Sequence, residues 1–214
     1  SSIGPTWDDR KKPDVVAPGS SIVSAFSQTV NNDPNLCFQE DSAGNCYDDL
    51  LKLNNFFIPA SGTSMAAPHV SGAANLLLEY GLSSKGTKAL LINTAEDKGN
   101  SGWDAYYGWG EIDLQRAYTF RDYTIDDGVN EGGYKFYKVP LLLTGEKATL
   151  VWNRHGIYAG ATTPTTLFPI NDLDLKLYKE VDGSLQGSSI EVKDNVEQIN
   201  SPSEFFDGVV KVEA

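Results

Sequence analysis

Cationic side chains and long apolar runs are scarce in this 214-residue sequence. Its 17 Lys and Arg residues stand against 29 Asp and Glu residues, so the formal net charge at pH 7 is −12. That balance repels a phosphate backbone, and we therefore expect no nucleic-acid partner. No apolar run approaches the roughly 20 residues that cross a bilayer as a helix, so we expect no membrane span.

Cysteine and histidine are also rare, with two residues of each. Cys37 and Cys46 lie in one polar, acidic stretch without a histidine, which is poor material for a metal site. They form either a local disulfide or two free thiols, and the disulfide would place the protein outside the cytoplasm. The sequence opens on Ser1 rather than Met, and no signal-peptide pattern is seen, so we expect a mature or excised fragment.

The stretch from Ser61 to Leu78 predicts a loop of small residues that enters a helix. Ser64 falls at or near the helix start, where free N–H groups and the positive end of the helix dipole favour an anion. A nucleophilic serine there could stabilise the oxyanion of acyl transfer with its own N–H group. The alternative is that Ser64 is an ordinary N-cap residue. Apolar spacings of three and four predict that the helix is largely buried, through Ala66, Val70, Ala73, Ala74, Leu77 and Leu78.

The string Gly-Thr-Ser-Met-Ala-x-Pro-His at residues 62–69 resembles the nucleophile segment of the subtilisin-like serine proteases. Residues 1–5 and 13–19 are similar to the segments that precede the nucleophile in that family. Residues 107–113 resemble the segment that closes its catalytic domain, with glycines that permit close backbone approach. The resemblance implies a secreted serine endopeptidase that attacks the peptide bonds of polypeptide substrates through Ser64, without a cofactor for catalysis.

A serine nucleophile needs a base and a group that orients the base, and this sequence supplies neither in the expected place. In subtilases the order along the chain is Asp, His, Ser, but no histidine precedes Ser64. His69 follows Ser64 by five residues, about 140° round a helix axis, and so points away from it. His155 belongs to a later, β-rich part. The aspartate of the triad is also absent, because Asp8, Asp9 and Asp14 lie in a different motif. The resemblance implies that a missing N-terminal part of the same protease carries the Asp and His.

Secondary structure changes character past residue 120. Before it we expect strands at 14–17 and 21–27, a polar surface insertion at 28–55, and helices at 84–95 and ending near 118. After it, short β-type runs predict a sandwich or barrel at 134–143, 148–152, 173–178, 189–192, 197–199 and 209–212. Residues 150–152, 171–175 and 194–198 are similar to the β-barrel domain appended to some subtilases. We expect the C-terminal part of a subtilisin-like α/β catalytic domain at 1–121 and an all-β jelly-roll or barrel domain, incomplete, at 122–214.

Domains of that appended type often bind calcium, so the resemblance implies a structural calcium ion held by Asp172 and Asp174. On a strand these two carboxylates point the same way and either share an ion or face solvent. Asp182 and Asp194 offer further oxygen ligands.

Two functions fit the sequence. The first is the nucleophile-bearing part of a secreted subtilisin-like endopeptidase, inactive alone because the Asp and His of the triad lie upstream. The second is a non-catalytic binding or structural protein that retains a subtilase scaffold.

We predict that Cys37 and Cys46 are bonded, because the short loop between them closes easily and the bond would stabilise the fold by about 2–3 kcal/mol. Intact-mass measurement after alkylation without reductant should show no modified thiol. Two alkylated thiols in the unreduced protein would contradict the prediction.

Overall fold

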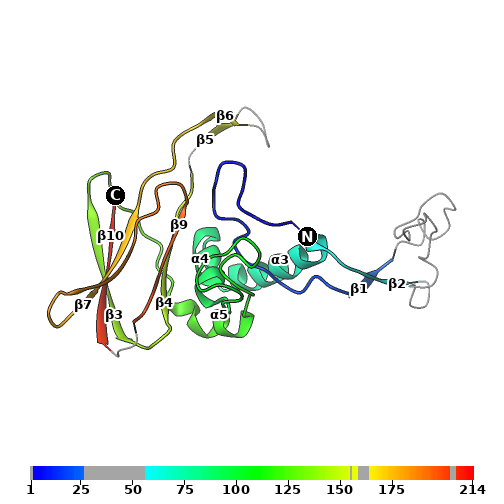
Figure 1. The fold of residues 1–214 in the computed structure, drawn as a ribbon, viewed down its shortest axis with the longest axis horizontal. Coiled ribbons are helices and arrows are strands. Elements are labelled where there is room, and N and C mark those ends of the chain that lie inside the picture. The colour runs from blue at the N-terminus through cyan, green and yellow to red at the C-terminus, as the bar shows by residue number, and fades with distance from the viewer. Residues whose placement is uncertain (1, 27–55, 155, 159–163, 203–205) are drawn as a thin grey trace. The chain divides into compact units, whose positions relative to one another are not determined.

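The computed structural model describes residues 2–26, 56–154, 156–158, 164–202 and 206–214 (Figure 1). The helices are α3 (Thr63–Glu79), α4 (Ser84–Thr94), α5 (Leu114–Phe120) and the short 3-10 helix η1 (Arg121–Tyr123). The strands are β1 (Ile22–Ala25), β2 (Phe57–Ala60), β3 (Tyr134–Leu142), β4 (Lys147–Val151), β5 (Gly156–Tyr158), β6 (Pro164–Leu167), β7 (Asp174–Lys179), β8 (Leu185–Ser189), β9 (Val196–Asn200) and β10 (Phe206–Glu213). Within these ranges no helix is both long and apolar enough to cross a membrane.

Contacts divide the chain into two compact units, Ser1–Ser2 with Ala17–Gly72 and Ile3–Val16 with Ala73–Ala214. The predicted domain boundary between residues 121 and 122 stays a prediction. The cysteine pair and the insertion at 28–55 lie outside the described residues.

The first unit contains an antiparallel pair of strands, β1 and β2. The register places Ile22 opposite Ala60 and Ala25 opposite Phe57. This confirms an extended segment near residues 21–27. The strand expected at 14–17 is wrong, because only an isolated parallel bridge between Val16 and Glu111 forms there. Prolines at both sides of that segment lack the N–H groups that a ladder requires.

Helix α3 begins directly after Ser61 and Gly62, which confirms the predicted loop-to-helix transition. Its predicted burial is wrong, since only Ala73 and Leu77 are buried. Leu76 and Leu78 are 49% and 42% exposed. An apolar stripe becomes buried only when other elements pack against it, and the described residues cover only part of this one.

Both predicted later helices are confirmed, and side chains cap their first turns. Ser83 accepts a hydrogen bond from the Gly86 N–H at 3.0 Å at the start of α4. At the start of α5, Asp113 accepts one from the Arg116 N–H at 2.9 Å. Such caps satisfy N–H groups that have no partner within the helix.

The segment before α5 also behaves as predicted, with glycines at points of close backbone approach. A Cβ on Gly110, whose φ is +125°, would lie 2.3 Å from the Glu96 carbonyl oxygen. The Gly110 carbonyl accepts the Val16 N–H at 2.9 Å, and the Trp109 N–H donates to the Asp14 carbonyl at 2.9 Å. Any larger residue at position 110 would push these backbone segments apart.

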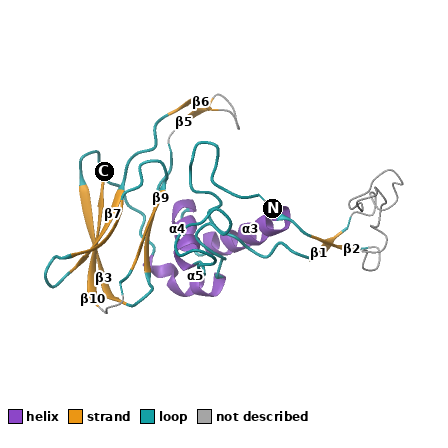
Figure 2. Ribbon diagram, viewed as in Figure 1, coloured by secondary structure: helices purple, strands orange, loops and turns teal. Residues whose placement is uncertain are grey.

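The C-terminal strands form a four-stranded antiparallel sheet, in the order β3-β10-β7-β8, and the pairs β4-β9 and β5-β6 (Figure 2). Burial alternates along β10, as expected for a strand with one inward face. The inward residues meet those of β4-β9 in one core: Leu142, Leu175, Leu177, Ile199, Phe206, Val210 and Val212, with Ala148 and Leu150.

These strands confirm most of the predicted β runs. The barrel expectation is wrong for the described residues, which close no barrel because β3 and β8 remain at opposite edges of their sheet. A jelly roll stays a prediction. The run at 189–192 is also wrong, because β8 ends at Ser189 and the Glu191 N–H binds a side chain instead of a neighbouring strand.

A second core joins helices to strands within the larger unit. Ile92 of α4, Trp109 and Val196 of β9 pack together, and Trp103 and Val151 border them. The Asn93 side-chain amide donates to the Lys147 carbonyl at 2.6 Å. Figure 1 shows β4 and β9 between the four-stranded sheet and helices α4 and α5.

Next to this core lies the buried carboxyl group of Glu197, which is 0% exposed. It accepts the Glu191 N–H at 2.6 Å and the Ser189 hydroxyl. Burial raises the pKa of Glu197, and the nearby Glu191 charge adds to this; the two hydrogen bonds and the Lys11 ammonium oppose it. The Lys11 Nζ atom lies 2.9 Å from Glu191 Oε1. The Lys11 charge that opposes the raised pKa of Glu197 is therefore paired with Glu191 as well.

Because the pKa of Glu197 is raised in the folded chain, its ionisation costs folding stability as pH rises through that pKa. Replacing Glu197 with glutamine removes the charge. The amide oxygen can still accept the Glu191 N–H, and the amide nitrogen can donate to the Ser189 hydroxyl. We predict that Glu197→Gln has a higher Tm than wild type at pH 7, and that the difference vanishes below the ordinary glutamate pKa of 4.5.

Glu191→Gln is the matched control, because the Glu191 side chain is 50% exposed and its change removes a surface ion pair with Lys11 and a minor charge near Glu197 but leaves the buried carboxylate in place. It should not raise the Tm at pH 7. A lower Tm for Glu197→Gln at that pH would show that the bonds of the ionised carboxylate outweigh its burial.

Candidate active site

Ser64 is the second residue of α3 and is exposed. Only Ser61 and Gly62 separate the helix from β2, so the chain passes from strand to helix through a two-residue turn. The hydroxyl of Ser64 makes no hydrogen bond to another residue that the structure describes. This placement agrees with the prediction that Ser64 lies at the helix start, while its catalytic role stays a prediction.

The turn before Ser64 is attached to the residues that precede β1. The Gly62 N–H donates to the Gly19 carbonyl at 2.7 Å. A Cβ on Gly19 would lie 2.7 Å from the Gly62 carbonyl oxygen and 3.2 Å from the Ala66 Cβ, so any side chain there would push the turn away. Gly62 has a φ of +153°, which favours glycine.

A side-chain hydrogen bond adds to this attachment. The Ser21 N–H donates to the Ser61 hydroxyl oxygen at 2.8 Å. Sequence reasoning missed this bond, and nothing in the local pattern around Ser61 indicates it.

The first turn of α3 leaves backbone groups free around Ser64. The Gly62 carbonyl accepts the N–H groups of Met65 at 3.0 Å and Ala66 at 3.4 Å. Within the described residues the Ser64 N–H has no acceptor. Pro68 has no N–H to donate to the Ser64 carbonyl, the partner it would have four residues back in a regular helix. The free N–H lies at the positive end of the helix dipole and is suited to an anion.

His69 does not reach Ser64. Its Nδ1 atom lies 2.9 Å from the Met65 carbonyl oxygen, one turn back on the same helix. Because a carbonyl only accepts, this nitrogen carries the proton and donates it. The contact agrees with the prediction that His69 points away from the nucleophile.

The remaining candidate triad residues either lie outside the described residues or are paired with cations. His155 lies outside the described residues. Each early aspartate faces a cation: Asp8 lies 2.9 Å from Arg10, Asp14 lies 2.7 Å from Lys12, and Asp9 lies 3.3 Å from Lys193. These ion pairs are the arrangement expected for structural surface aspartates.

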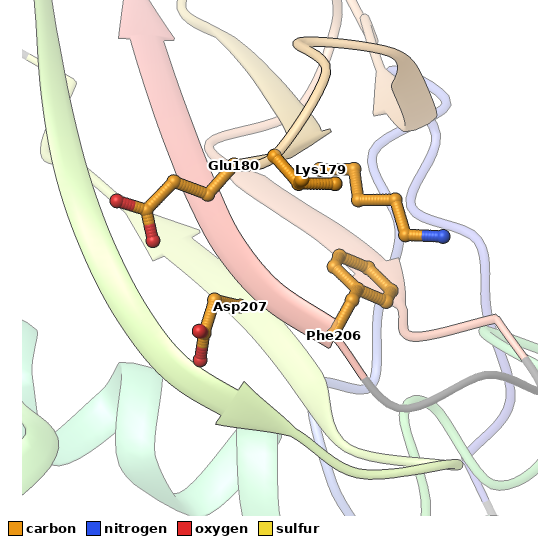
Figure 3. Close-up of a pocket in the computed structure, with 5 residues that line it drawn as sticks. Lys179, Glu180, Phe206 and Asp207 are labelled. Atoms are coloured by element: carbon orange, nitrogen blue, oxygen red, sulfur yellow. The ribbon is translucent and has the colours of Figure 1, made fainter.

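A hollow of about 520 Å³ lies elsewhere, between the ends of β7 and β10, and is lined by Lys179, Glu180, Val181, Phe206 and Asp207. The Lys179 ammonium lies 5.8 Å from the centre of the Phe206 ring. Figure 3 shows the carboxyl groups of Glu180 and Asp207 on the other side of the hollow. None of these residues is a serine, cysteine or histidine, so this hollow lacks the groups for acyl transfer.

Three of the four proposed calcium ligands bind different partners within the chain. Asp174 faces the Lys176 ammonium at 3.3 Å, and Asp172 is exposed. Asp182 binds Ser184, and the buried Asp194 accepts the N–H groups of Lys11 and Asn195. Among the described residues no group of three or more His, Cys, Asp or Glu side chains is arranged for a metal ion. Asp172 and Asp174 alone supply too few ligands, so backbone carbonyls or water would have to complete the site.

Comparison with known proteins identifies the family. A family model described as the subtilase family (peptidase S8) matches residues 1–110, more than half of the 214-residue chain. The chain belongs to the subtilase family. The matched region includes the turn at Ser61–Gly62, Ser64 and the segment up to Gly110.

Curated relatives are serine proteases of much greater length. An extracellular serine protease of Serratia marcescens is 39% identical over 106 residues, which cover 48% of this chain and 10% of that protein. The serine protease/ABC transporter B family protein tagA of Dictyostelium discoideum is 28% identical over 240 residues, which cover 100% of this chain and 13% of that protein. This subtilase chain therefore spans only about a tenth of the length of these relatives.

Solved structures that resemble this chain include fervidolysin from Fervidobacterium pennivorans, a keratinolytic enzyme related to subtilisin. It is 22% identical, with a TM-score of 0.34, and the match covers 86% of this chain and 22% of that one.

Calcium binding at Asp172 and Asp174 stays a prediction. A bound ion would stabilise the folded chain, so the Tm should be higher in excess calcium than in chelator. Asp172→Asn combined with Asp174→Asn should abolish the difference. An equal Tm of the unmodified chain in both solutions would contradict the prediction.

Proposed function

We propose that this chain is the nucleophile-bearing part of a secreted subtilisin-like serine endopeptidase, with Ser64 as the nucleophile. The observation that supports this most directly is the position of Ser64. It is exposed at the start of α3, within the region matched by the family model, and its own N–H group has no acceptor among the residues that the structure describes. The name of the Serratia marcescens relative supports secretion.

The proposed chemistry uses each of these features. The Ser64 Oγ atom attacks the carbonyl carbon of a peptide bond, and a base removes the hydroxyl proton as the new bond forms. The Ser64 N–H group donates one hydrogen bond to the oxyanion that develops, and the helix dipole favours its charge. As this intermediate collapses, its C–N bond breaks and the protonated base gives its proton to the amine half of the substrate, which leaves. The acyl group stays on Ser64 until water attacks it and releases it as the acid, which restores the serine hydroxyl.

The base and its orienting aspartate are proposed to lie upstream of this chain in the same protease. His69 is bound to the Met65 carbonyl on its own helix, and the early aspartates are paired with cations. Polypeptides are the proposed substrates, as the family suggests. A serine hydroxyl is a weak nucleophile at neutral pH without a base, so the chain alone is proposed to be inactive.

A fluorophosphonate probe, which bonds covalently to activated serines, tests this function. We predict no labelling of Ser64 in the 214-residue chain and strong labelling in a longer protease that contains it with the upstream Asp and His segments. Ser64→Ala should abolish that labelling. Ser71→Ala should leave it unchanged, because Ser71 lies on the same helix and donates only to the Ala67 carbonyl.

Two results would contradict the proposal in different ways. Labelling of Ser64 in the chain alone would show that a base lies within these residues. A folded longer protease that is not labelled would favour a non-catalytic binding or structural protein that retains a subtilase scaffold.

A further inference from the structure

The Ser61 side chain extends the pairing of β1 and β2 by one residue beyond the last backbone pair of the two strands. The register places Ile22 opposite Ala60, so the next pair would be Ser21 opposite Ser61. Ser21 has a φ of +53°, a left-handed conformation in which a regular ladder does not continue. The Ser21 N–H instead donates to the Ser61 hydroxyl at 2.8 Å, so a side chain takes the place of the missing backbone acceptor.

This bond acts on the short turn that determines where Ser64 lies. Ser61 and Gly62 are the whole connection between β2 and α3, and Ser64 is the second residue of the helix. Two hydrogen bonds hold the turn against residues 19–21, one from the Gly62 N–H to the Gly19 carbonyl and one through the Ser61 hydroxyl. The first is a backbone bond, which only proline at position 62 would remove directly, whereas the second depends on a single side chain.

From this geometry we infer that Ser61 is a positioning residue for Ser64, an inference that rests on the proposed function. The Ser61 hydroxyl fixes the turn in the place from which Ser64 can attack a bound carbonyl. The rate of such a step depends steeply on position, because a misplacement of about 1 Å can cost on the order of a hundredfold.

The same bond contributes little to folding stability. Ser21 and Ser61 are both exposed, so water can bind the Ser21 N–H once the hydroxyl is removed. A positioning role therefore predicts lower kcat with an almost unchanged KM and Tm. A role that was only structural would lower the Tm instead, and a direct contact with substrate would raise KM.

The test uses the longer protease that contains this chain, with kcat and KM measured separately on a peptide substrate. Ser61→Ala should lower kcat and the rate of fluorophosphonate labelling on the order of tenfold, with KM within about twofold of wild type. Ser61→Thr keeps the hydroxyl and should restore most of the rate. Ser71→Ala is the matched serine-to-alanine control on α3 and should match wild type.

The inference is overturned if Ser61→Ala retains the wild-type kcat, if Ser61→Thr is as slow as Ser61→Ala, or if the loss appears in KM or Tm rather than in kcat. Failure of the proposed function gives a different result, because the wild-type protease itself would then not be labelled at Ser64. Labelled wild type beside an unaffected Ser61→Ala variant overturns only the positioning role.

Discussion

The backbone hydrogen bond from Gly62 to Gly19 is the constraint on which the candidate site depends. It requires two chain segments to approach so closely that a side chain on Gly19 would collide with the Gly62 carbonyl or with Ala66. Because Gly62 immediately precedes α3, the same contact determines where the helix begins and therefore where Ser64 is exposed. The position of the proposed nucleophile is thus a property of the backbone, which explains why glycine occupies both position 19 and position 62.

The larger unit depends on a different constraint, the sharing of one core between helices and strands. Ile92, Trp109 and Val196 come from three separate parts of the sequence and pack against one another. The buried carboxyl group of Glu197 follows Val196 directly, and its partners Ser189 and Glu191 come from the end of β8. Satisfying that carboxyl group ends the strand, since the Glu191 N–H cannot bind both Glu197 and a neighbouring strand.

Sequence reasoning predicted the features that local pattern controls. The string around Ser64 predicted a helix start, the caps at Ser83 and Asp113 begin predicted helices, and the β-type run at 209–212 predicted part of β10. It did not predict the Ser21–Ser61 bond, because the two residues are 40 positions apart and meet only through the register of β1 and β2. Nor did it predict the burial of Glu197, since a glutamate within a short β-type run gives no local signal that its neighbours will enclose it.

The predicted burial of α3 failed for a related reason. Apolar periodicity shows which face of a helix is suited to burial, but the surface that covers this face belongs to other segments. Ala73 and Leu77 are covered by described residues, whereas Leu76 and Leu78 remain largely exposed.

The proposed chemistry likewise combines groups close to Ser64 in the sequence with groups from distant segments. The turn and the first turn of α3 supply the place of the nucleophile and one donor for the oxyanion, and both come from backbone groups within a few residues of Ser64. Acceptance of the hydroxyl proton needs a side chain, and the nearest histidine in the sequence is held by the Met65 carbonyl. A base from another segment can meet Ser64 only after the two segments pack together, so in the proposed protease the folding of the whole domain controls when the serine becomes reactive.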